Sequence, residues 1–518
     1  MVLAVGIALD LLSFIGWSDP ALTTVITLSV ITVVAIGAFI DIRIGVAAVL
    51  LELLWGSHGH LLRVATGGPG VSLRICLFLV VMSAAVWHLR TFGARHALWS
   101  LIRIHPVRWL ALAFLLTLGL AGILGMIRHP IDRVFFDANA WGFLALAPAF
   151  LIAAASRANT ANHSLIRTNT RMVVNERGVP SNDVGLDSCA MLLCGASYLI
   201  LRFYALLFLF SHDLGGTWMP LYQWVRDTRL GEVTIFFGAF PRIFLPSMVL
   251  LFPVVLLAGL RTMRISQRLE GKREGEGNRM LTISVFGGGI AVLLLSLSRS
   301  YWMGFAALGT IGIAWGMWSW LRSRHSPIRM SGRMVSATIV LVGSVAVMSL
   351  LAMAIVRLPY PPPLTTAGFT ETFIARFQQD AAVANRWQEI GPLRSAIGKH
   401  LAFGNGFGAA VTYETKDPRT LAAYPNGRYT TTAFEWGYLD DLLERGYIGL
   451  LAELWFIGAL IWHGFRQGGE TAALALGLLA IAVVHATSPY LNHPLGIGIM
   501  LLLFAYSTEP LEIPNTTA

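Results

Sequence analysis

Four carboxylates stand close together near residue 440 of an otherwise apolar chain. They are Glu435, Asp440, Asp441 and Glu444, within F-E-W-G-Y-L-D-D-L-L-E-R-G-Y-I-G-L-L, residues 434 to 451. On a helix, Asp440 and Glu444 share one face and Glu435 lies about one turn earlier. Acidic residues at a helix N-terminus also stabilise its dipole, which accounts for some of the four. The rest predict a partly buried network in which one carboxylate acts as a general base.

A second polar group surrounds Arg299, in S-L-S-R-S-Y-W, residues 296 to 302. Two strongly apolar stretches flank it, and a charge there is costly unless it is paired or faces a watery cavity. The guanidinium and the hydroxyls of Ser296, Ser298 and Ser300 together suit an anionic group such as phosphate. An arginine that extends from a helix end to the interface is the alternative.

The composition assigns the chain to the membrane. Of its 518 residues, 55% are hydrophobic and 13% are charged, a balance that soluble domains of this size do not reach. Apolar runs long enough to cross a hydrocarbon core of about 30 Å recur along the chain. We therefore expect an all-α polytopic membrane protein with about 12–14 transmembrane helices and one large helical loop on the outer side. The expected spans lie near residues 2–17, 21–40, 44–56, 75–89, 109–127, 141–155, 189–210, 243–260, 280–297, 301–321, 334–356, 446–464, 471–487 and 493–507.

Four loops rich in arginine and lysine fall on one side of the membrane under this assignment. They contain residues 90–108, 157–177, 261–273 and 322–333, and the positive-inside rule makes that side cytoplasmic, together with both termini. The formal net charge of +10 then anchors the helices, and nucleic-acid binding is not expected. The three cysteines, Cys76, Cys189 and Cys194, are expected to be buried apolar side chains, and their spacing indicates no metal site.

The segments expected on the other side are residues 57–74, 128–140, 211–242 and 357–437. The domain organisation that follows is 1–260 for the N-terminal helices, 261–356 for the helices around the serine-arginine motif, 357–437 for the large outer segment and 438–518 for the C-terminal helices.

The outer segment has an internal order of its own. Residues 373–390 show an amphipathic helical pattern, which we expect Pro392 to end or kink. The G-N-G-F-G of residues 404–408 serves a tight turn or the close approach of a ligand. Tyr413, Tyr424 and Tyr429 follow, and they either stack on sugar rings or pack within the loop.

These pieces, taken in order, resemble the bacterial O-antigen ligase and polymerase superfamily. The resemblance covers residues 280–465: S-L-S-R-S-Y-W, a basic loop, one more span, an outer segment with R-W and G-N-G-F-G, and a helix with Y-L-D-D-L-L-E-R-G-Y-I-G-L-L. It implies a multi-helix glycosyltransferase of the inner membrane with a periplasmic active site. Its members transfer a glycan from undecaprenyl diphosphate to an acceptor glycan, without a nucleotide sugar or a metal, and partners in chain-length control or export remain open.

The resemblance also implies roles for single residues. Arg299 would bind the diphosphate, and Arg386 would assist it. The glycines at 404, 406 and 408 would shape the loop near the acceptor. The substrate-binding set implied in this way is Arg386, Ser298, Ser300, Gly404, Gly406, Gly408, Tyr438 and Asp441.

One departure from the family pattern bears on the assignment. Ligases usually have a histidine three residues before the aromatic of the Y-L pair, and this chain has Glu435 there, before Tyr438. A partly buried carboxylate can replace imidazole as the proton acceptor. We therefore expect a polymerase of exopolysaccharide or O-antigen repeats, with Glu435 and Arg299 as catalytic residues, and a ligase as the alternative. His400, the only histidine in the outer segment, is expected at the surface.

Three further readings remain open. A lipid-linked oligosaccharide flippase would also use arginines for diphosphate, although it has little need of a folded outer segment of about 80 residues. A secondary transporter would show related halves, and no repeat is visible between residues 1–260 and 261–518. A non-catalytic assembly subunit is the third.

Overall fold

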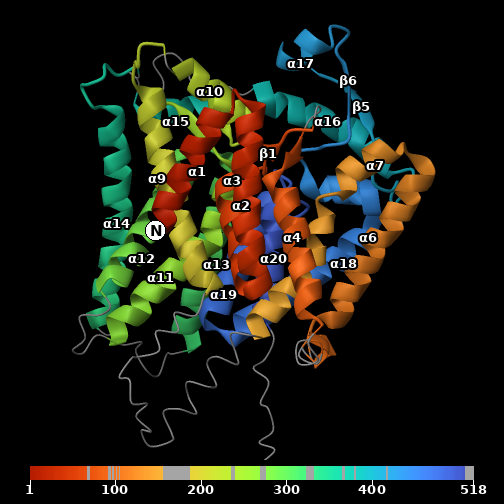
Figure 1. Ribbon diagram of the computed structural model, residues 1–518, viewed down its shortest axis with the longest axis horizontal. Helices are drawn as coiled ribbons and strands as arrows, with labels where there is room; N and C mark the ends of the chain where they lie inside the picture. Colours follow the sequence, from red (N-terminus) through yellow and green to blue (C-terminus); the bar gives the residue numbers. More distant parts are fainter. Residues whose placement is uncertain are drawn as a thin grey trace, which may run out of the picture.

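The computed structural model is a bundle of apolar helices. It describes residues 1–66, 70–90, 95, 98–100, 102–103, 105–155, 187–216, 218–234, 240–268, 276–322, 332–364, 368–378, 381–415 and 418–507. The helices of the bundle run side by side between its two ends (Figure 1). The chain is thus an all-α protein with the form of a multi-pass membrane protein.

Among the described residues, seven helical segments are long and apolar enough to cross a membrane. They belong to α2 (Pro20–Ile40), α6 (Arg108–Arg128), α9 (Ser188–Ser211), η2–α11 (Pro246–Leu250 and Leu251–Arg268), α12 (Glu276–Leu295), α14 (Gly332–Val356) and α18 (Gly437–Gln467). A bent pair of helices raises the number to eight if it counts as one span. The pair is α7 (Ile131–Ala138) and the helix Trp141–Ala155, which begins as η1 (Trp141–Leu146), and the bend between them is 50°.

The other expected spans are also helices, but most are short. They are α1 (Val2–Gly16), α3 (Ile42–Gly56), α4 (Leu73–His88), α13 (Arg299–Arg322), α19 (Gly469–His485) and α20 (Pro494–Tyr506). A rise of 1.5 Å per residue gives the 13 residues of α20 a length of about 20 Å, short of a core of about 30 Å. The count of 12–14 complete crossings is therefore higher than helix length and composition support among the described residues.

Burial separates the centre of the bundle from its periphery. The apolar windows of α9 and of η2–α11 are 67% buried, whereas those of α2, α6 and α14 are 22% buried. The outer helices expose isoleucine, valine and leucine side chains such as Val33, Ile127 and Leu350. Exposed apolar faces of this extent are the surface that a bilayer covers.

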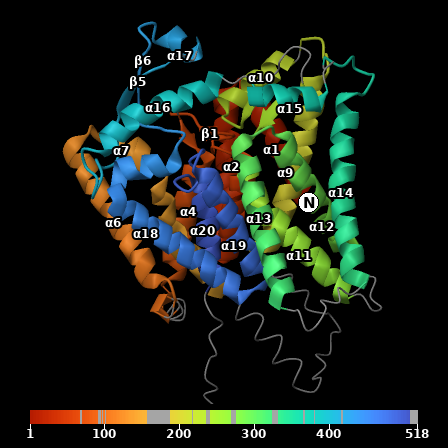
Figure 2. The same ribbon diagram turned by 180° about the vertical axis from the view of Figure 1, so that it is seen from behind.

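The shorter elements gather at one end of the bundle, the upper end in Figures 1 and 2. They include the helices α10 (Trp218–Asp227), α15 (Phe369–Gln378), α16 (Ala381–Ile397) and α17 (Pro418–Ala423). Three two-stranded antiparallel hairpins join them: β1 (Arg63–Val64) with β2 (Val71–Ser72), β3 (Glu232–Thr234) with β4 (Arg242–Phe244), and β5 (Val411–Glu414) with β6 (Arg428–Thr431). We call this the loop end of the bundle.

One sequence expectation about the loop end is wrong. Pro392 was expected to end or kink the helix, and it does not end it, because α16 continues to Ile397. A proline removes one backbone donor and crowds the preceding turn. Tertiary contacts compensate, since Leu393 and Ile397 are buried in a small core with Ala409, Val411, Phe434 and Leu443.

A buried ion pair fixes α1 against α9. The guanidinium of Arg202 donates to both carboxylate oxygens of Asp10, at 2.7 and 2.5 Å, and to the carbonyl of Trp55. Tyr198 also donates to Asp10. The Arg202 side chain is 3% exposed, so loss of Asp10 would leave an uncompensated charge inside the bundle.

Asp10→Ala should therefore lower the free energy of unfolding by about 3 kcal/mol, as expected for one partner removed from a buried pair. The measurement is denaturation of the purified chain in detergent. Adding Arg202→Met should recover most of the loss, because the stranded charge is then gone. The control is Asp19→Ala, which removes the exposed cap of α2 and should cost about 1 kcal/mol. Equal losses for the two aspartates would contradict the structural role of the pair.

Candidate functional site

The helix that carries the acidic residues is broken in its first third. Gly446 has φ 62° and ψ −170°, so α18 consists of two helical parts that meet at this residue. A break frees backbone donors and acceptors, and in a buried position such as Gly446 these groups need partners. The chain at residues 401–406 supplies these partners. The bonds run from Tyr447 N–H to Leu401 O (2.8 Å), Ile448 N–H to Ala402 O (3.1 Å), Asn405 N–H to Leu443 O (2.7 Å) and Gly406 N–H to Glu444 O (2.9 Å).

The three glycines of G-N-G-F-G permit this contact. Gly404, Gly406 and Gly408 have φ of 73°, 87° and 84°, a region that favours glycine. A Cβ on Gly404 would lie 2.3 Å from the Glu444 carbonyl oxygen, and one on Gly406 would lie 2.3 Å from the amide nitrogen of Gly125 in α6. The glycines therefore seat the loop against α18, α6 and α7. We call residues 401–408 the splint.

Side chains from α6 and α7 hold the splint from its other side. Arg128 donates to the Gly404 carbonyl at 2.9 Å, and a ring nitrogen of His129 lies 3.1 Å from the Asn405 carbonyl oxygen. Asp137 accepts the Gly408 N–H at 2.7 Å and approaches the Glu444 carboxyl group within hydrogen-bonding reach. The splint thus belongs to the bundle rather than to a freely exposed loop.

Arg445, the residue before the break, is the centre of a buried ionic network. Its Nη2 bonds Asp441 and, at 2.6 Å, Glu453, and all three side chains are 0% exposed. Its guanidinium also lies 4.8 Å from the ring centroid of Trp141 and 5.7 Å from that of Phe114. Aromatic faces and two carboxylates stabilise a charge that hydrocarbon alone would not accept.

His485 extends this network to α19. Its Nδ1 accepts the N–H of Leu491 at 3.0 Å, and its Nε2 lies 2.9 Å from Asp441. A backbone N–H can only donate, so Nδ1 of His485 must accept the bond from Leu491 and carries no proton. The ring proton is therefore on Nε2, which donates to Asp441. Asp441 is consequently bonded from both sides, by Arg445 and by His485. Tyr438 fixes the same two helices, since its hydroxyl donates to the Ala482 carbonyl at 2.7 Å.

The loop between α19 and α20, residues 486–493, joins the distant parts of the site. We call it the hub loop. Short helices on both sides keep it within the depth of the bundle, where irregular backbone needs protein or water around it. Its contacts are Ser488 Oγ to Ser300 Oγ (3.1 Å), Tyr490 OH to Tyr301 OH (2.9 Å), Asn492 Nδ2 to Asp440 Oδ2 (3.4 Å) and His493 Nε2 to His58 Nδ1 (3.3 Å).

The serine-arginine motif forms the start of α13. Arg299 is the first residue of the helix and is half-buried, while Ser298 and Ser300 are buried and their hydroxyls lie 3.1 Å apart. Leu297 has φ 54°, so the chain turns sharply before the helix. The positive end of the α13 dipole adds to the charge of Arg299, and this combination attracts an anion.

Glu435 and Arg386 meet where the outer segment returns to the bundle. Their side chains form an ion pair in which Glu435 is 51% exposed and Arg386 is 32% exposed. Trp436 Nε1 donates to the Arg386 carbonyl at 2.9 Å, and the rings of Trp387 and Trp436 are 5.5 Å apart. Trp436 thus ties the start of α18 to the backbone at Arg386, with Trp387 against its ring, while the charges of the pair stay accessible to solvent.

A neighbouring carboxylate on α16 is held differently. Glu389 accepts the Tyr413 hydroxyl at 2.8 Å and is 6% exposed. Burial raises the pKa of Glu389, although the bond from Tyr413 and the charge of Arg386 act in the opposite direction. Tyr413 pairs across the β5–β6 hairpin with Tyr429, whose ring lies 5.4 Å from that of the exposed Tyr424.

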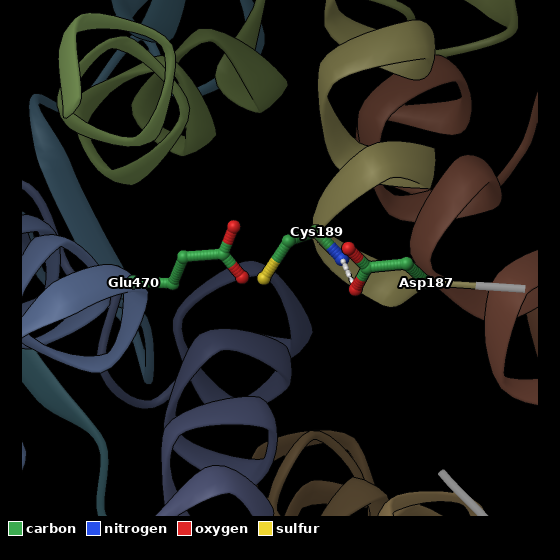
Figure 3. Close-up of side chains that lie close together, drawn as sticks. All are labelled: Asp187, Cys189 and Glu470. Atoms are coloured by element: carbon green, nitrogen blue, oxygen red, sulfur yellow. Dashed lines mark hydrogen bonds between the residues drawn. The ribbon is translucent and has the colours of Figure 1, made fainter. Parts of the chain in front are cut away.

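A different group of potential metal ligands lies toward the other end of the bundle. Asp187, Cys189 and Glu470 present ligand atoms within 4.8 Å of one another (Figure 3). Their carboxylates are already engaged, because Arg261 Nη2 lies 2.7 Å from both Asp187 and Glu470. A metal ion would have to displace this guanidinium, so the group fits an ion-paired helix junction better than a metal site.

Comparison of the chain with protein-family models, with curated proteins and with solved structures gave no match. The likeness to the O-antigen ligase and polymerase superfamily therefore stays a prediction from sequence motifs. The same holds for the catalytic and substrate-binding roles assigned above.

The expected site residues thus fall into three places. Arg386 contacts Glu435 directly, and beside Arg299 the hydroxyl of Ser300 bonds both Ser298 and Ser488 of the hub loop. Tyr438, Asp441 and the glycines make contacts within the protein that position helices. The sequence reasoning missed the hub loop, although its polar residues between two apolar runs were a signal.

Gly406→Ala should test the splint. The methyl group meets the backbone of Gly125 at a left-handed residue, so we expect a loss of about 3 kcal/mol in the free energy of unfolding in detergent. The control is Gly343→Ala on α14, where a Cβ meets nothing within 4 Å and stability should be unchanged or slightly higher. A Gly406→Ala protein as stable as the control would exclude the close contact with α6.

Proposed function

We propose that the protein is a glycosyltransferase that polymerises glycan repeats carried on a polyprenyl diphosphate, at the face of the membrane where the loop end lies. The donor is an undecaprenyl-diphosphate-linked oligosaccharide, and the acceptor is a hydroxyl group of another repeat. The proposal includes a bacterial inner-membrane location, cytoplasmic termini and a periplasmic active site. Its motif basis is the resemblance described above.

The observation that carries the proposal is the ion pair between Arg386 and Glu435. Transfer from a diphosphate needs a cation for the leaving group and an acceptor for the hydroxyl proton. These two residues are 49 positions apart in sequence, yet their side chains meet in an accessible place beside two tryptophans. Exposed aromatic faces next to charged groups are also suited to binding a sugar ring.

The chemistry divides between these side chains. The acceptor oxygen attacks the anomeric carbon of the donor. The bond between this carbon and the diphosphate oxygen breaks, and the diphosphate leaves with the electron pair. The hydroxyl proton passes to the Glu435 carboxylate. Arg386 pairs with that carboxylate before transfer. Once Glu435 has taken up the proton, the Arg386 guanidinium turns to the departing diphosphate.

Arg299 holds the diphosphate in this scheme. Its charge adds to the N-terminus of α13, which has no acidic residue in its first turn. The hydroxyls of Ser298, Ser300 and Ser488 fix the turn that carries it. Tyr438 and Asp441 act as positioning residues, because they hold α18 against α19. The splint glycines let residues 401–408 pack against the break in α18.

Glu435 favours a polymerase over a ligase. Ligases of the family have histidine at this position, and a carboxylate paired with arginine differs in charge from imidazole at neutral pH. Ligation to the lipid A core remains the alternative within the same chemistry. A flippase for lipid-linked oligosaccharides is the alternative of another class. In a flippase, Arg299 would bind the diphosphate along the transport path.

Glu435→Gln keeps the shape of the side chain and removes its basicity. In cells that make the polymer, we expect a loss of about a hundredfold or more, the usual contribution of a general base. Arg299→Ala should abolish the polymer. In both variants, single repeat units should accumulate on the carrier at the periplasmic face, measured by extraction of lipid-linked oligosaccharides and their accessibility to an external glycosidase.

Glu371→Gln is the matched control, since Glu371 is an exposed carboxylate on α15 in the same outer segment. Its polymer should be unchanged. Units that remain on the cytoplasmic face would favour the flippase, and normal polymer from Glu435→Gln would remove the base role from that residue. Normal polymer from Arg299→Ala as well would overturn glycosyl transfer by this site.

A further inference from the structure

The β5–β6 hairpin projects from the loop end, beyond the apolar bundle, and α17 joins its two strands (Figures 1 and 2). Val411, at the start of β5, packs with Leu393 and Ile397 of α16 in a small core. The hairpin is therefore fixed to the helix that carries Arg386, while its outer part stands clear of the apolar helices. It offers a surface for a ligand that is soluble in water.

The two strands place their tyrosines on one face. Along β5, Tyr413 is buried and Thr412 is exposed, and the register of the hairpin pairs Tyr413 with Tyr429 and Thr412 with Thr430. Side chains of directly paired residues lie on the same face of a hairpin, and neighbours along a strand lie on opposite faces. The tyrosines therefore occupy the face toward α16, whose Glu389 bonds Tyr413, and the threonines occupy the face toward solvent.

The tyrosine rings form a row that runs from the interior to the surface. The ring centroids of Tyr413 and Tyr429 are 5.8 Å apart, and those of Tyr429 and Tyr424 are 5.4 Å apart. Tyr413 is 6% exposed, Tyr429 is half-buried and Tyr424 is 46% exposed. The two roles that the sequence left open for these residues thus separate. Tyr413 packs within the outer segment, whereas Tyr429 and Tyr424 present accessible ring surface.

A buried acceptor lies at the inner end of this row. One carboxylate oxygen of Glu389, Oε1, accepts the Tyr413 hydroxyl at 2.8 Å. The other, Oε2, is buried and has no hydrogen-bond partner among the residues that the structure describes. A buried carboxylate oxygen without a donor is costly, and the hydroxyl groups of a ligand are donors that remove this cost. The row of tyrosines thus ends at a group that can bind a hydroxyl.

The same turn of α16 reaches the Arg386–Glu435 pair. Glu389 follows Arg386 by three positions, so the two side chains are neighbours on the surface of the helix. Between them in sequence, Trp387 is 63% exposed, and its ring lies 5.5 Å from that of Trp436, just before α18. Aromatic rings therefore lie on both sides of this turn, with the tryptophans beside the ion pair and the tyrosines on the hairpin.

We propose that the tyrosine face of the hairpin is a binding site for the glycan of the acceptor, beyond the sugar whose hydroxyl reacts. Tyr429 and Tyr424 stack on sugar rings, and Glu389 Oε2 accepts a sugar hydroxyl. An aromatic face binds the apolar face of a sugar while polar groups bind its hydroxyls, whereas a lipid chain gains nothing from a buried carboxylate. The assignment to the acceptor rests on the proposed transfer at Glu435, but glycan binding is measurable without transfer.

The test uses the purified full chain with Glu435→Gln in dodecyl maltoside, so that binding is measured apart from transfer. The probe is the repeat oligosaccharide released by mild acid from the carrier lipid of cells that make the polymer, labelled with a fluorophore at its reducing end. Fluorescence polarisation gives its Kd. Tyr429→Ala and Tyr424→Ala should each raise this Kd about tenfold, the loss expected for one aromatic contact. Tyr429→Phe should leave it unchanged, because the ring remains.

Glu389→Gln tests the buried acceptor. Its amide oxygen can still accept from Tyr413, but an NH2 group takes the place of Oε2, so the Kd should rise about fivefold, as for one lost hydrogen bond. Tyr360→Ala is the matched control, since Tyr360 is a tyrosine of the same outer segment and is 86% exposed. Its Kd should equal that of the parent.

The site would be overturned if Tyr429→Ala and Tyr424→Ala had the same Kd as Tyr360→Ala, or if the parent chain did not bind the oligosaccharide. The transfer proposal fails by a different result, namely normal polymer in cells with Glu435→Gln and in cells with Arg299→Ala. In cells with Glu435 intact, Tyr429→Ala should shorten the polymer chains on gels, while single repeat units are still consumed.

Discussion

The break in α18 constrains the whole loop end, because the backbone groups around the buried Gly446 need hydrogen-bond partners. Gly446 interrupts the helix, and the splint at residues 401–408 supplies donors and acceptors to both sides of the interruption. In return the break fixes the splint, and with it the outer segment that leads to Glu435. The outer segment is therefore tied to the membrane bundle by backbone bonds, not by side chains alone.

The buried charge of Arg445 makes this arrangement specific. One guanidinium is bonded by carboxylates from both parts of α18, since Asp441 precedes the break and Glu453 follows it. A different angle between the two parts would leave one of these charges unpaired, at a cost of several kcal/mol. His485 bonds Asp441 and so connects α19 to the same network. The hub loop that follows α19 bonds Ser300, next to Arg299, and His58.

The sequence predicted the positions of the apolar helices because about 20 apolar residues are a strong signal, but it could not predict how far each helix crosses. It also marked Arg386 and Glu435 separately. Their pairing could not be predicted, since a hairpin and the splint lie between them. The hub loop was missed for a similar reason: Asn492 and His493 are ordinary loop residues, and their partners lie 52 and 435 positions away.

The four carboxylates near residue 440 differ in their exposure to solvent, and this difference separates their roles. In sequence they form one group, yet Asp440, Asp441 and Glu444 are 4%, 0% and 3% exposed, whereas the Glu435 side chain is 51% exposed. A buried carboxylate fixed by an arginine and a histidine cannot exchange a proton with a sugar hydroxyl that it does not reach. Glu435 alone combines an adjacent guanidinium with access from outside. In the proposed transfer, the proton therefore passes to Glu435, which precedes the helix, and the buried carboxylates of α18 hold the helix in place.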